Sequence, residues 1–251
     1  MNRIELSNRE WLCVLLHLTT LRGIRLGSPE QCRKFVSAVL WILRTGAQWR
    51  ALPAEHGKWN SIFKRYSRWC ANGIWDELLT TIAEQADLQD VSIDGSVIRA
   101  HACAAGARGS TAEKEALGRS KGGFSCKIHA VCDGLGMPVR FLLTGGQEAE
   151  CKIAIPLVKG LSMSALLADK AYDTNEFRAW LKAREIKAVI PPKSNRKEPF
   201  ECDFWHYKER HAIECLFGKL KHYRRIATRY EKKAINYMGM LCFSSLLLWL
   251  R

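Results

Sequence analysis

Four polar residues near the C-terminal end of the chain share a spacing that fits one face of a helix. They are Tyr207, Arg210, Glu214 and Lys221, separated by 3, 4 and 7 positions. At about 100° per residue, this spacing places all four within roughly 60° of one another. Apolar residues occupy the adjoining arc, namely Ile213, Leu216, Phe217 and Leu220. The pattern predicts one helix with a packed stripe beside a polar stripe. Such a polar stripe suits a site that holds a metal and an anionic backbone together.

The charge balance indicates a polyanionic partner. The chain has 251 residues and a formal net charge of +14. A charge of this size is typical of proteins that bind nucleic acid, although a basic protein without such a partner remains an alternative. Its hydrophobic content of 47%, with nine tryptophans, is ample for a core. The length allows one large domain or two small ones.

The cysteines and the apolar segments favour a reducing cytoplasm. None of the ten cysteines belongs to a Cys-x-x-Cys pair. Cys126, His129 and Cys132 come closest to a zinc grouping, but on a strand His129 would point to the opposite face from the cysteines. No secretory leader is visible in residues 1–10, and the apolar run 241–250 is about half the length that crosses a bilayer. We therefore expect no structural disulfide and no zinc.

Residues 1–88 are predicted to form an all-helical DNA-binding domain resembling a helix-turn-helix. Ser7–Glu10 is a capping box, Ser28–Pro29 begins a second helix, and 59–71 is a third. The third helix interleaves aromatic residues, expected in the core, with the basic residues Lys64, Arg65 and Arg68. Such a basic side suits contact with the duplex backbone, and an ordinary bundle with solvated cations is the alternative.

Residues 89–251 have the pattern of an α/β domain. A strand is expected at 91–98 and a long mobile loop at 100–123. The further expected elements are a hairpin at 127–143, a helix at 152–161, a strand at 165–168, a helix at 175–184, a strand at 187–190, the helix containing Glu214, and a last helix at 236–250. This order predicts a mixed sheet with helices packed on it.

Three carboxylates are the candidate catalytic residues: Asp94, Asp169 and Glu214. Each lies in or at the end of an element expected to be buried, where a carboxylate is costly unless it is paired or bound to metal. Hard oxygen donors without a convincing cysteine or histidine cluster suit Mg²⁺ or Mn²⁺. Two such ions can support phosphodiester chemistry.

Each acid also has an ordinary structural interpretation. Asp94 and the glycine after it could form a hairpin turn between two short strands. Asp169 could cap a helix, and Asp173 is a rival four positions on. Glu214 could simply pair with Arg210 across one helical turn. Spacing alone does not show that the three acids meet.

Together these motifs resemble the DDE transposases of bacterial insertion sequences, and within them the insertion-sequence-five group of the insertion-sequence-four-like superfamily. The resemblance rests on Asp94, on Asp169 opening Asp-Lys-Ala-Tyr-Asp, and on the Tyr–Arg–Glu–Lys spacing. Further matching segments are 38–50, 99–101, 118–124, 127–129 and 224–230. The resemblance covers about residues 35 to 251, and its C-terminal end leads us to expect a complete chain.

The resemblance implies a ribonuclease-H-like fold for 89–251 and binding to terminal inverted repeats. It implies Mg²⁺-dependent cleavage to 3′-hydroxyl ends and their transfer to target DNA. It assigns metal binding to Asp94, Asp169 and Glu214, and DNA contacts to Tyr207, Arg210 and Lys221. We add the basic loop residues Arg196 and Lys197 to the expected DNA contacts. A homo-oligomer on double-stranded DNA, at the bacterial nucleoid, is the implied working state.

Two positions depart from the group's pattern. Gly95 stands where the group often has serine or another small residue, and this glycine is expected to loosen the strand around Asp94. Ala51 stands where an acid is common.

Two other functions remain open. A metal-dependent nuclease that cuts without joining is one alternative function. A non-catalytic DNA-binding protein, such as a decayed transposase, is the other, and the presence of all three acids disfavours it.

Overall fold

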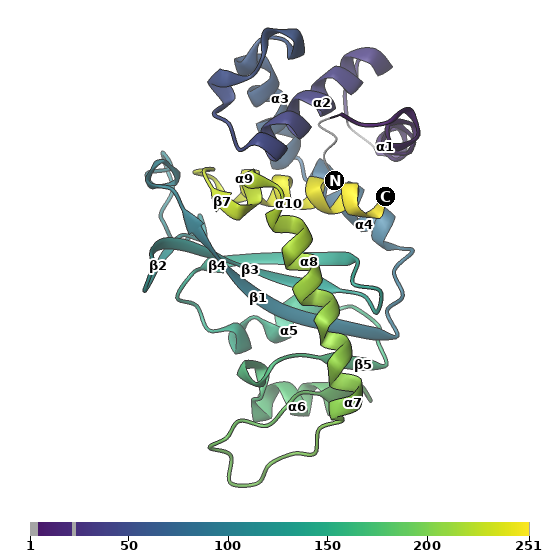
Figure 1. The fold of residues 1–251 in the computed structure, drawn as a ribbon, viewed down its shortest axis with the longest axis vertical. Coiled ribbons are helices and arrows are strands. Elements are labelled where there is room, and N and C mark those ends of the chain that lie inside the picture. The colour runs from purple at the N-terminus through teal and green to yellow at the C-terminus, as the bar shows by residue number, and fades with distance from the viewer. Residues whose placement is uncertain (1–4, 22–23, 251) are drawn as a thin grey trace. The chain divides into compact units, whose positions relative to one another are not determined.

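The computed structural model describes residues 5–21 and 24–250, which pack into two compact units built from separate stretches of chain (Figure 1). The helical unit comprises the described parts of 1–84, 99–115 and 220–251. The sheet unit comprises 85–98 and 116–219. These packing units do not follow the expected boundary at residue 88, because part of the expected second domain packs with the N-terminal helices. The functional domains 1–88 and 89–251 stay a prediction.

The N-terminal helices begin and end where their capping residues predict. The longer helices of this unit are α1 (Asn8–Thr20), α2 (Pro29–Thr45), α3 (Trp59–Ala71), α4 (Ile74–Ala83) and α10 (Ala234–Trp249). The capping box at Ser7 is confirmed, and the Ser28 side chain accepts a hydrogen bond from the amide of Gln31. Gly46, at φ 69°, ends α2 in the left-handed conformation that glycine adopts without strain.

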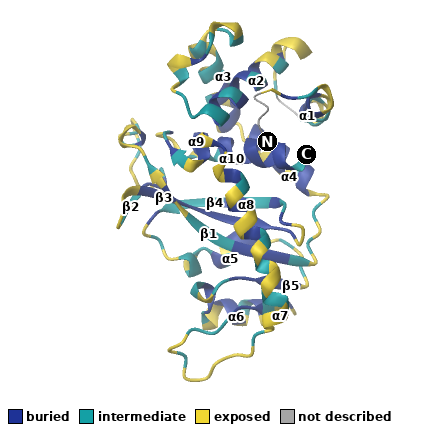
Figure 2. Ribbon diagram, viewed as in Figure 1, coloured by how far each residue is buried: buried dark blue, intermediate teal, exposed yellow. Residues whose placement is uncertain are grey.

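Helix α10 forms the centre of the helical unit and is dark along most of its length in Figure 2. It is apolar on every face, which is typical of a buried helix. Trp75 of α4 packs on Phe243 with ring centroids 4.8 Å apart. A side chain at Gly239 would place its Cβ 2.5 Å from the Cys70 sulfur, so only glycine allows this approach. Within the described residues, no helix is both long and apolar enough to span a membrane.

The sheet has the mixed, ribonuclease-H-like arrangement that the sequence predicts. Its strands are β1 (Asp90–Ala100), β2 (Gly118–Ser120), β3 (Gly123–Cys132), β4 (Pro138–Gly145), β5 (Ala165–Leu167), β6 (Lys187–Val189) and β7 (Thr228–Arg229). The order is β2-β3-β1-β5-β6, with β4 beside β3 and β7 beside the last two residues of β1. Strands β3 and β4 form the expected hairpin, and β1, β5 and β6 run parallel.

Four helices belong to the sheet unit, namely α5 (Ala154–Val158), α6 (Asn175–Lys182), α7 (Phe204–Tyr207) and α8 (His211–Lys221). Two of them, α5 and α6, contribute to one apolar cluster with the sheet. Val91 and Ile93 of β1 contribute to the cluster with Phe177 and Leu181 of α6. The alternation of apolar residues along β1 and the 3.6-residue period of α6 therefore meet in one core.

Three elements of the structure differ in detail from those that the sequence predicts. The predicted loop at 100–123 contains the 3₁₀ turn η3 (Ala102–Ala104) and strand β2. The helix predicted at 152–161 shortens to α5 after the 3₁₀ turn η4 (Glu150–Lys152). The helix expected through Tyr207 is interrupted by the 3₁₀ turn η6 (Lys208–Arg210). A 3₁₀ turn advances about 120° per residue instead of 100°, so it rotates Tyr207 away from the position that uniform helical spacing predicts.

Candidate active site

Asp94 lies within β1, and Asp169 lies two residues beyond the end of the neighbouring parallel strand β5. The β1–β5 register pairs Ser92 with Leu167, and two further residues along each chain reach the two acids. Neighbouring strands are about 4.8 Å apart, so these positions are side by side. β1 runs unbroken through Asp94, which excludes the hairpin-turn interpretation of this residue. Asp169 also caps a short 3₁₀ helix, since its Oδ1 accepts a hydrogen bond of 2.8 Å from the amide of Ala171.

One guanidinium joins the strand acid to the helix acid. Arg210 donates from Nη2 to Oδ2 of Asp94 at 2.7 Å and from Nη1 to Oε1 of Glu214 at 2.6 Å. The Asp94 side chain is 15% exposed and that of Glu214 is 55% exposed. The pairing of Glu214 with Arg210 across one helical turn is therefore real, but it is part of a three-residue bridge that ties β1 to the α8 side of the sheet unit.

Burial raises the pKa of Asp94 to about 6. Arg210 and the amide of Gly95 oppose this shift, whereas the charges of Asp169 and Glu150 add to it. Like charges raise the pKa of a carboxyl only when they are close. The raised pKa of Asp94 therefore agrees with the strand register, since both place Asp169 near Asp94. The same shift shows that a fourth acid, Glu150, is also close.

That fourth acid, Glu150, is absent from the sequence prediction. It forms an ion pair of 3.1 Å with Lys127 of β3 and lies against Gly95. A Cβ at Gly95 would lie 2.8 Å from Oε1 of Glu150, so the missing side chain makes room for this carboxylate. The strand is not interrupted at Gly95. Glu150 stands in a 3₁₀ turn with no periodic pattern, so no spacing in the sequence points to it.

Two tyrosines border the acids and keep their protons. Tyr172 is buried, and within the described residues its hydroxyl makes no hydrogen bond. Burial raises the pKa of Tyr172, and the charges of Glu150, Asp94 and Asp169 raise it further. Burial also raises the pKa of Tyr207, against the lowering effect of Arg210. Both phenols are therefore hydrogen-bond donors at neutral pH.

Asp173, the rival acid, has a structural role. Its two oxygens accept hydrogen bonds from Arg178, from Arg196 and from the amide of Lys193. Burial acts to raise its pKa, but the hydrogen bonds outweigh burial and lower the pKa to about 2. This places the Arg196 guanidinium in an internal ion pair rather than free in the basic loop. Lys197, next to it, is exposed.

The other residues predicted to contact DNA also fall into two groups, those with exposed side chains and those held by internal contacts. Lys64 and Arg68 of α3 are exposed, and so is Lys221 at the end of α8. Arg65, between the first two, points inward. It donates 2.8 Å to the carbonyl of Leu26 and lies 4.3 Å from the Phe35 ring centroid. A contact with DNA by Arg65 or Arg196 requires these internal contacts to be broken.

The carboxylates around Asp94 suit a hard divalent cation, but Arg210 occupies two of them. The side chains that meet around Asp94 supply carboxylate oxygens, the donors that Mg²⁺ and Mn²⁺ prefer. Within the described residues, however, no three candidate ligands already converge on one point. The Arg210 guanidinium stands between Asp94 and Glu214 and donates a hydrogen bond to each. Metal binding by these two carboxylates therefore requires at least part of the arginine bridge to be exchanged.

Two sequence families match successive parts of the chain. Residues 6–79 match a family described as "Putative transposase of IS4/5 family". Residues 85–248 match a family described as "Transposase DDE domain". The second match covers the sheet strands and all of the acids discussed above.

Individual relatives agree with these families. The chain is 42% identical over 128 residues to "Putative transposase for insertion sequence element IS6501" of Brucella ovis, a match that covers 50% of this chain and 98% of that protein. It is 30% identical over 125 residues to the transposase for insertion sequence element IS1106 of Neisseria meningitidis serogroup B, covering 47% of this chain and 41% of that protein. Among solved structures, a piggyBac transposase synaptic complex with hairpin DNA has a TM-score of 0.39 at 11% identity, covering 78% of this chain and 45% of that one.

Proposed function

The chain belongs to the family of proteins with a transposase DDE domain, and from this premise we propose that it is the transposase of an insertion sequence. In this proposal it binds the terminal inverted repeats of the element and cleaves them to 3′-hydroxyl ends. It then joins those ends to target DNA. It acts on double-stranded DNA as a homo-oligomer that holds both ends of the element.

The arrangement around Arg210 carries the proposal. Asp94 lies on β1, Asp169 follows the end of the adjacent strand β5, and the arginine links Asp94 to Glu214. We assign these three carboxylates to the binding of Mg²⁺, with Mn²⁺ as the alternative. When bound, the divalent ions supply activation of the attacking water or 3′-hydroxyl and stabilisation of the leaving oxygen.

The neighbouring side chains have roles toward the DNA backbone. The Arg210 fork can exchange a carboxylate for a phosphate, because guanidinium binds both groups in the same two-pronged geometry. Tyr207 retains its proton and can donate to a phosphate oxygen. The exposed cations Lys221 and Lys197 can contribute charge along the strand. In the helical unit, Lys64 and Arg68 offer backbone contacts to the terminal repeat.

A strand-transfer assay tests this proposal. The substrate is the DNA that flanks the coding sequence, with its inverted repeats, incubated with the protein, Mg²⁺ and a supercoiled target plasmid. The proposal expects cleavage at the repeat ends and covalent joining to the target. Cleavage without joining would instead indicate a nuclease of the same fold, and binding without cleavage a non-catalytic DNA-binding protein.

A further inference from the structure

Strands β2 and β3 form a short two-stranded ribbon that extends past the end of β4. The pairing of β3 with β4 begins at Cys126, which lies opposite Gly145, whereas β2 pairs with residues 123–125 of β3. We call residues 119–124, around the turn of this ribbon, the ribbon tip. They are exposed or half-buried, and β2 lies at the edge of the sheet (Figure 1). The proposed cleavage and joining chemistry gives the ribbon tip no role.

The ribbon tip is cationic. Arg119 and Lys121 are both exposed, and residues 116–132 contain no aspartate or glutamate. No carboxylate of this stretch of chain therefore offsets the two charges. Positive charges gathered in this way on an exposed turn favour a polyanion, such as the phosphate backbone of a nucleic acid.

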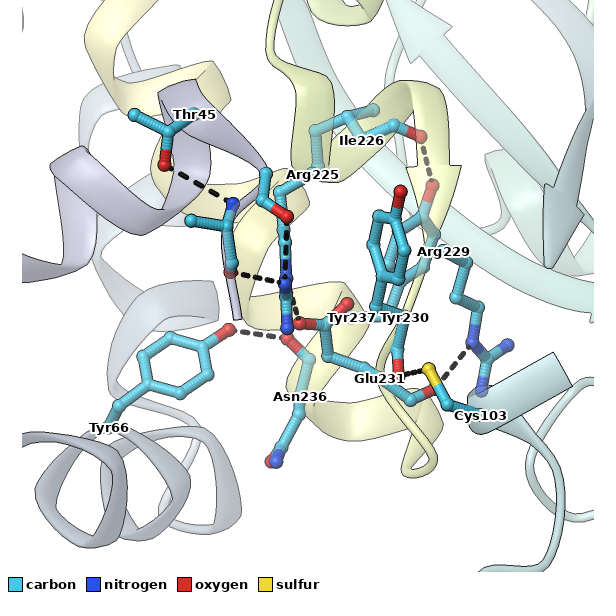
Figure 3. A network of polar contacts seen from close by, with 12 residues as sticks. Thr45, Tyr66, Cys103, Arg225, Ile226, Arg229, Tyr230, Glu231, Asn236 and Tyr237 are labelled. Atoms are coloured by element: carbon cyan, nitrogen blue, oxygen red, sulfur yellow. Dashed lines mark hydrogen bonds and ion pairs between the residues drawn. The ribbon is translucent and has the colours of Figure 1, made fainter. Parts of the chain in front are cut away.

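Phe124 holds the Arg119 guanidinium in position. The two residues pair across the ribbon, and the guanidinium carbon lies 4.8 Å from the Phe124 ring centroid. A guanidinium that stacks on a ring keeps the N–H groups at its edge for hydrogen bonds. Arg225 of the helical unit shows the opposite case, because it is buried and donates to Glu231 and to two backbone carbonyls (Figure 3). Arg119 is thus suited to bind a phosphate, whereas Arg225 serves the fold.

Glycines keep the ribbon tip narrow. Gly123 has a φ of 94°, a conformation that favours glycine, and a Cβ built on it would meet nothing within 4 Å. The amide of the preceding Gly122 donates 3.3 Å to the Ser120 hydroxyl, which closes the turn. Without side chains at these two positions, the backbone of the turn can come close to another molecule. A two-stranded ribbon is also narrow enough to enter the major groove of DNA.

The strand that carries the ribbon tip also borders the acids. Lys127, four residues after Gly123 on β3, forms the ion pair with Glu150 beside Gly95. Four residues of a strand span roughly 13 Å. One strand of DNA carries a phosphate about every 3.4 Å along the helix axis. A duplex with its cut phosphate at the acids therefore has further phosphates, about four nucleotides away, at the distance of the ribbon tip.

We propose that the ribbon tip binds the backbone of duplex DNA about four nucleotides from the cut, without reading the base sequence. Arg119 binds one phosphate through the edge of its guanidinium, Lys121 contacts a second, and Phe124 keeps Arg119 in place. Phosphate contacts position DNA but carry no direct sequence information. The ribbon tip is therefore a positioning element for any duplex that enters the site. The choice of DNA as the polyanion rests on the proposed function.

The salt dependence of binding tests this proposal. Arg119→Gln combined with Lys121→Gln removes both charges, and fluorescence anisotropy measures binding to a terminal-repeat duplex and to a scrambled duplex over a range of salt. Each lost phosphate contact lowers the slope of log K against log salt by about 0.9. The slope should fall by about 1.8, and the affinity at 0.1 M salt by roughly 10- to 60-fold, equally for both duplexes. An unchanged slope, or a loss confined to the repeat duplex, would overturn the proposal.

Two single variants assign the effect to the ribbon tip. Phe124→Leu keeps both charges, so it should leave the slope unchanged and weaken binding by roughly two- to fivefold through loss of the stacked ring. Lys182→Gln removes one charge at an exposed lysine of α6 and is the matched control, which should bind both duplexes as wild type does. A slope lowered as much by Lys182→Gln as by either charge of the ribbon tip would show that only total charge matters and would overturn the proposal.

A methylphosphonate, which removes one backbone charge, locates the contact. Placed about four nucleotides from the cut, it should weaken binding by wild type and leave the double variant unaffected. Equal weakening of both proteins at every position tested would overturn the proposal. If wild type binds neither duplex, the proposed function fails and this inference fails with it. If wild type binds both duplexes and the double variant keeps the full slope, only the assignment of the ribbon tip fails.

Discussion

Asp173→Asn is expected to destabilise the protein strongly, although this acid lies only four positions from Asp169. The Asp173 side chain is fully buried and is held by Arg178, by Arg196 and by the amide of Lys193. Asparagine keeps the shape but removes the charge, and it turns an NH₂ group toward groups that are all donors. Breaking a buried ion pair from one side costs about 3–5 kcal/mol. Asparagine retains one acceptor, so we expect about 3 kcal/mol.

The lowered pKa of Asp173 gives a second value for the free energy that its charge contributes to folding. The folded value is about 2 and the ordinary value is 3.8. This difference corresponds to at most roughly 2.5 kcal/mol of stability, since each pKa unit is worth about 1.36 kcal/mol. Because the folded pKa is the lower one, the stabilisation is present above about pH 4 and is lost as the pH falls toward 2. The difference in unfolding free energy between wild type and Asp173→Asn should therefore become smaller as the pH falls over that range.

Thermal unfolding followed by circular dichroism measures both effects. At pH 7, a loss of about 3 kcal/mol lowers the Tm by roughly 6–12 °C for a chain of this size. The matched control is Asp169→Asn, which keeps a good helix cap and should change the Tm little. If Asp173→Asn unfolds within a degree of wild type, or if Asp169→Asn is the more destabilising of the two, the structural assignment of Asp173 is wrong.

Four further substitutions test other parts of the structure. Gly95→Ala should displace Glu150 and destabilise the protein by about 1–3 kcal/mol, as overpacking does; an unchanged Tm would show that the space beside Glu150 is not confined. Arg65→Gln should lower the Tm, whereas Lys64→Gln should weaken DNA binding with little change in Tm, and the reverse pattern would place Arg65 on the DNA. Lys221→Ala should weaken DNA binding and reduce the slope of log K against log salt by about 1. An unaltered slope would argue against a phosphate contact.

Local signals in the sequence predict most of the elements. The capping serines define α1 and α2, and the paired apolar runs define the β3–β4 hairpin, because these patterns act over a few residues. The sequence also placed Asp94 within one buried strand and Asp169 at the end of another, but spacing alone did not show that these two acids meet. Their exact register needed the structure.

Features that depend on contacts between distant residues were not predictable. Glu150 approaches Asp94 only because Gly95 lacks a side chain. The helix 234–249 is apolar on every face, so its pattern predicts burial but does not say which helices will cover it. In the helical unit, Trp49 and Glu231 line one pocket although they lie far apart in the sequence. In each case the deciding contact is tertiary, whereas sequence patterns report local structure.

Strand cleavage by single-acid variants tests the central assignment most directly. Asp94→Asn, Asp169→Asn and Glu214→Gln would each be assayed in Mg²⁺ on DNA that carries the terminal repeats, with binding measured in parallel. We predict that every one of these variants binds the repeats and that none cleaves them. Full cleavage by any one of the three, under conditions in which wild type cleaves, would contradict the assignment of these carboxylates to one metal-dependent site.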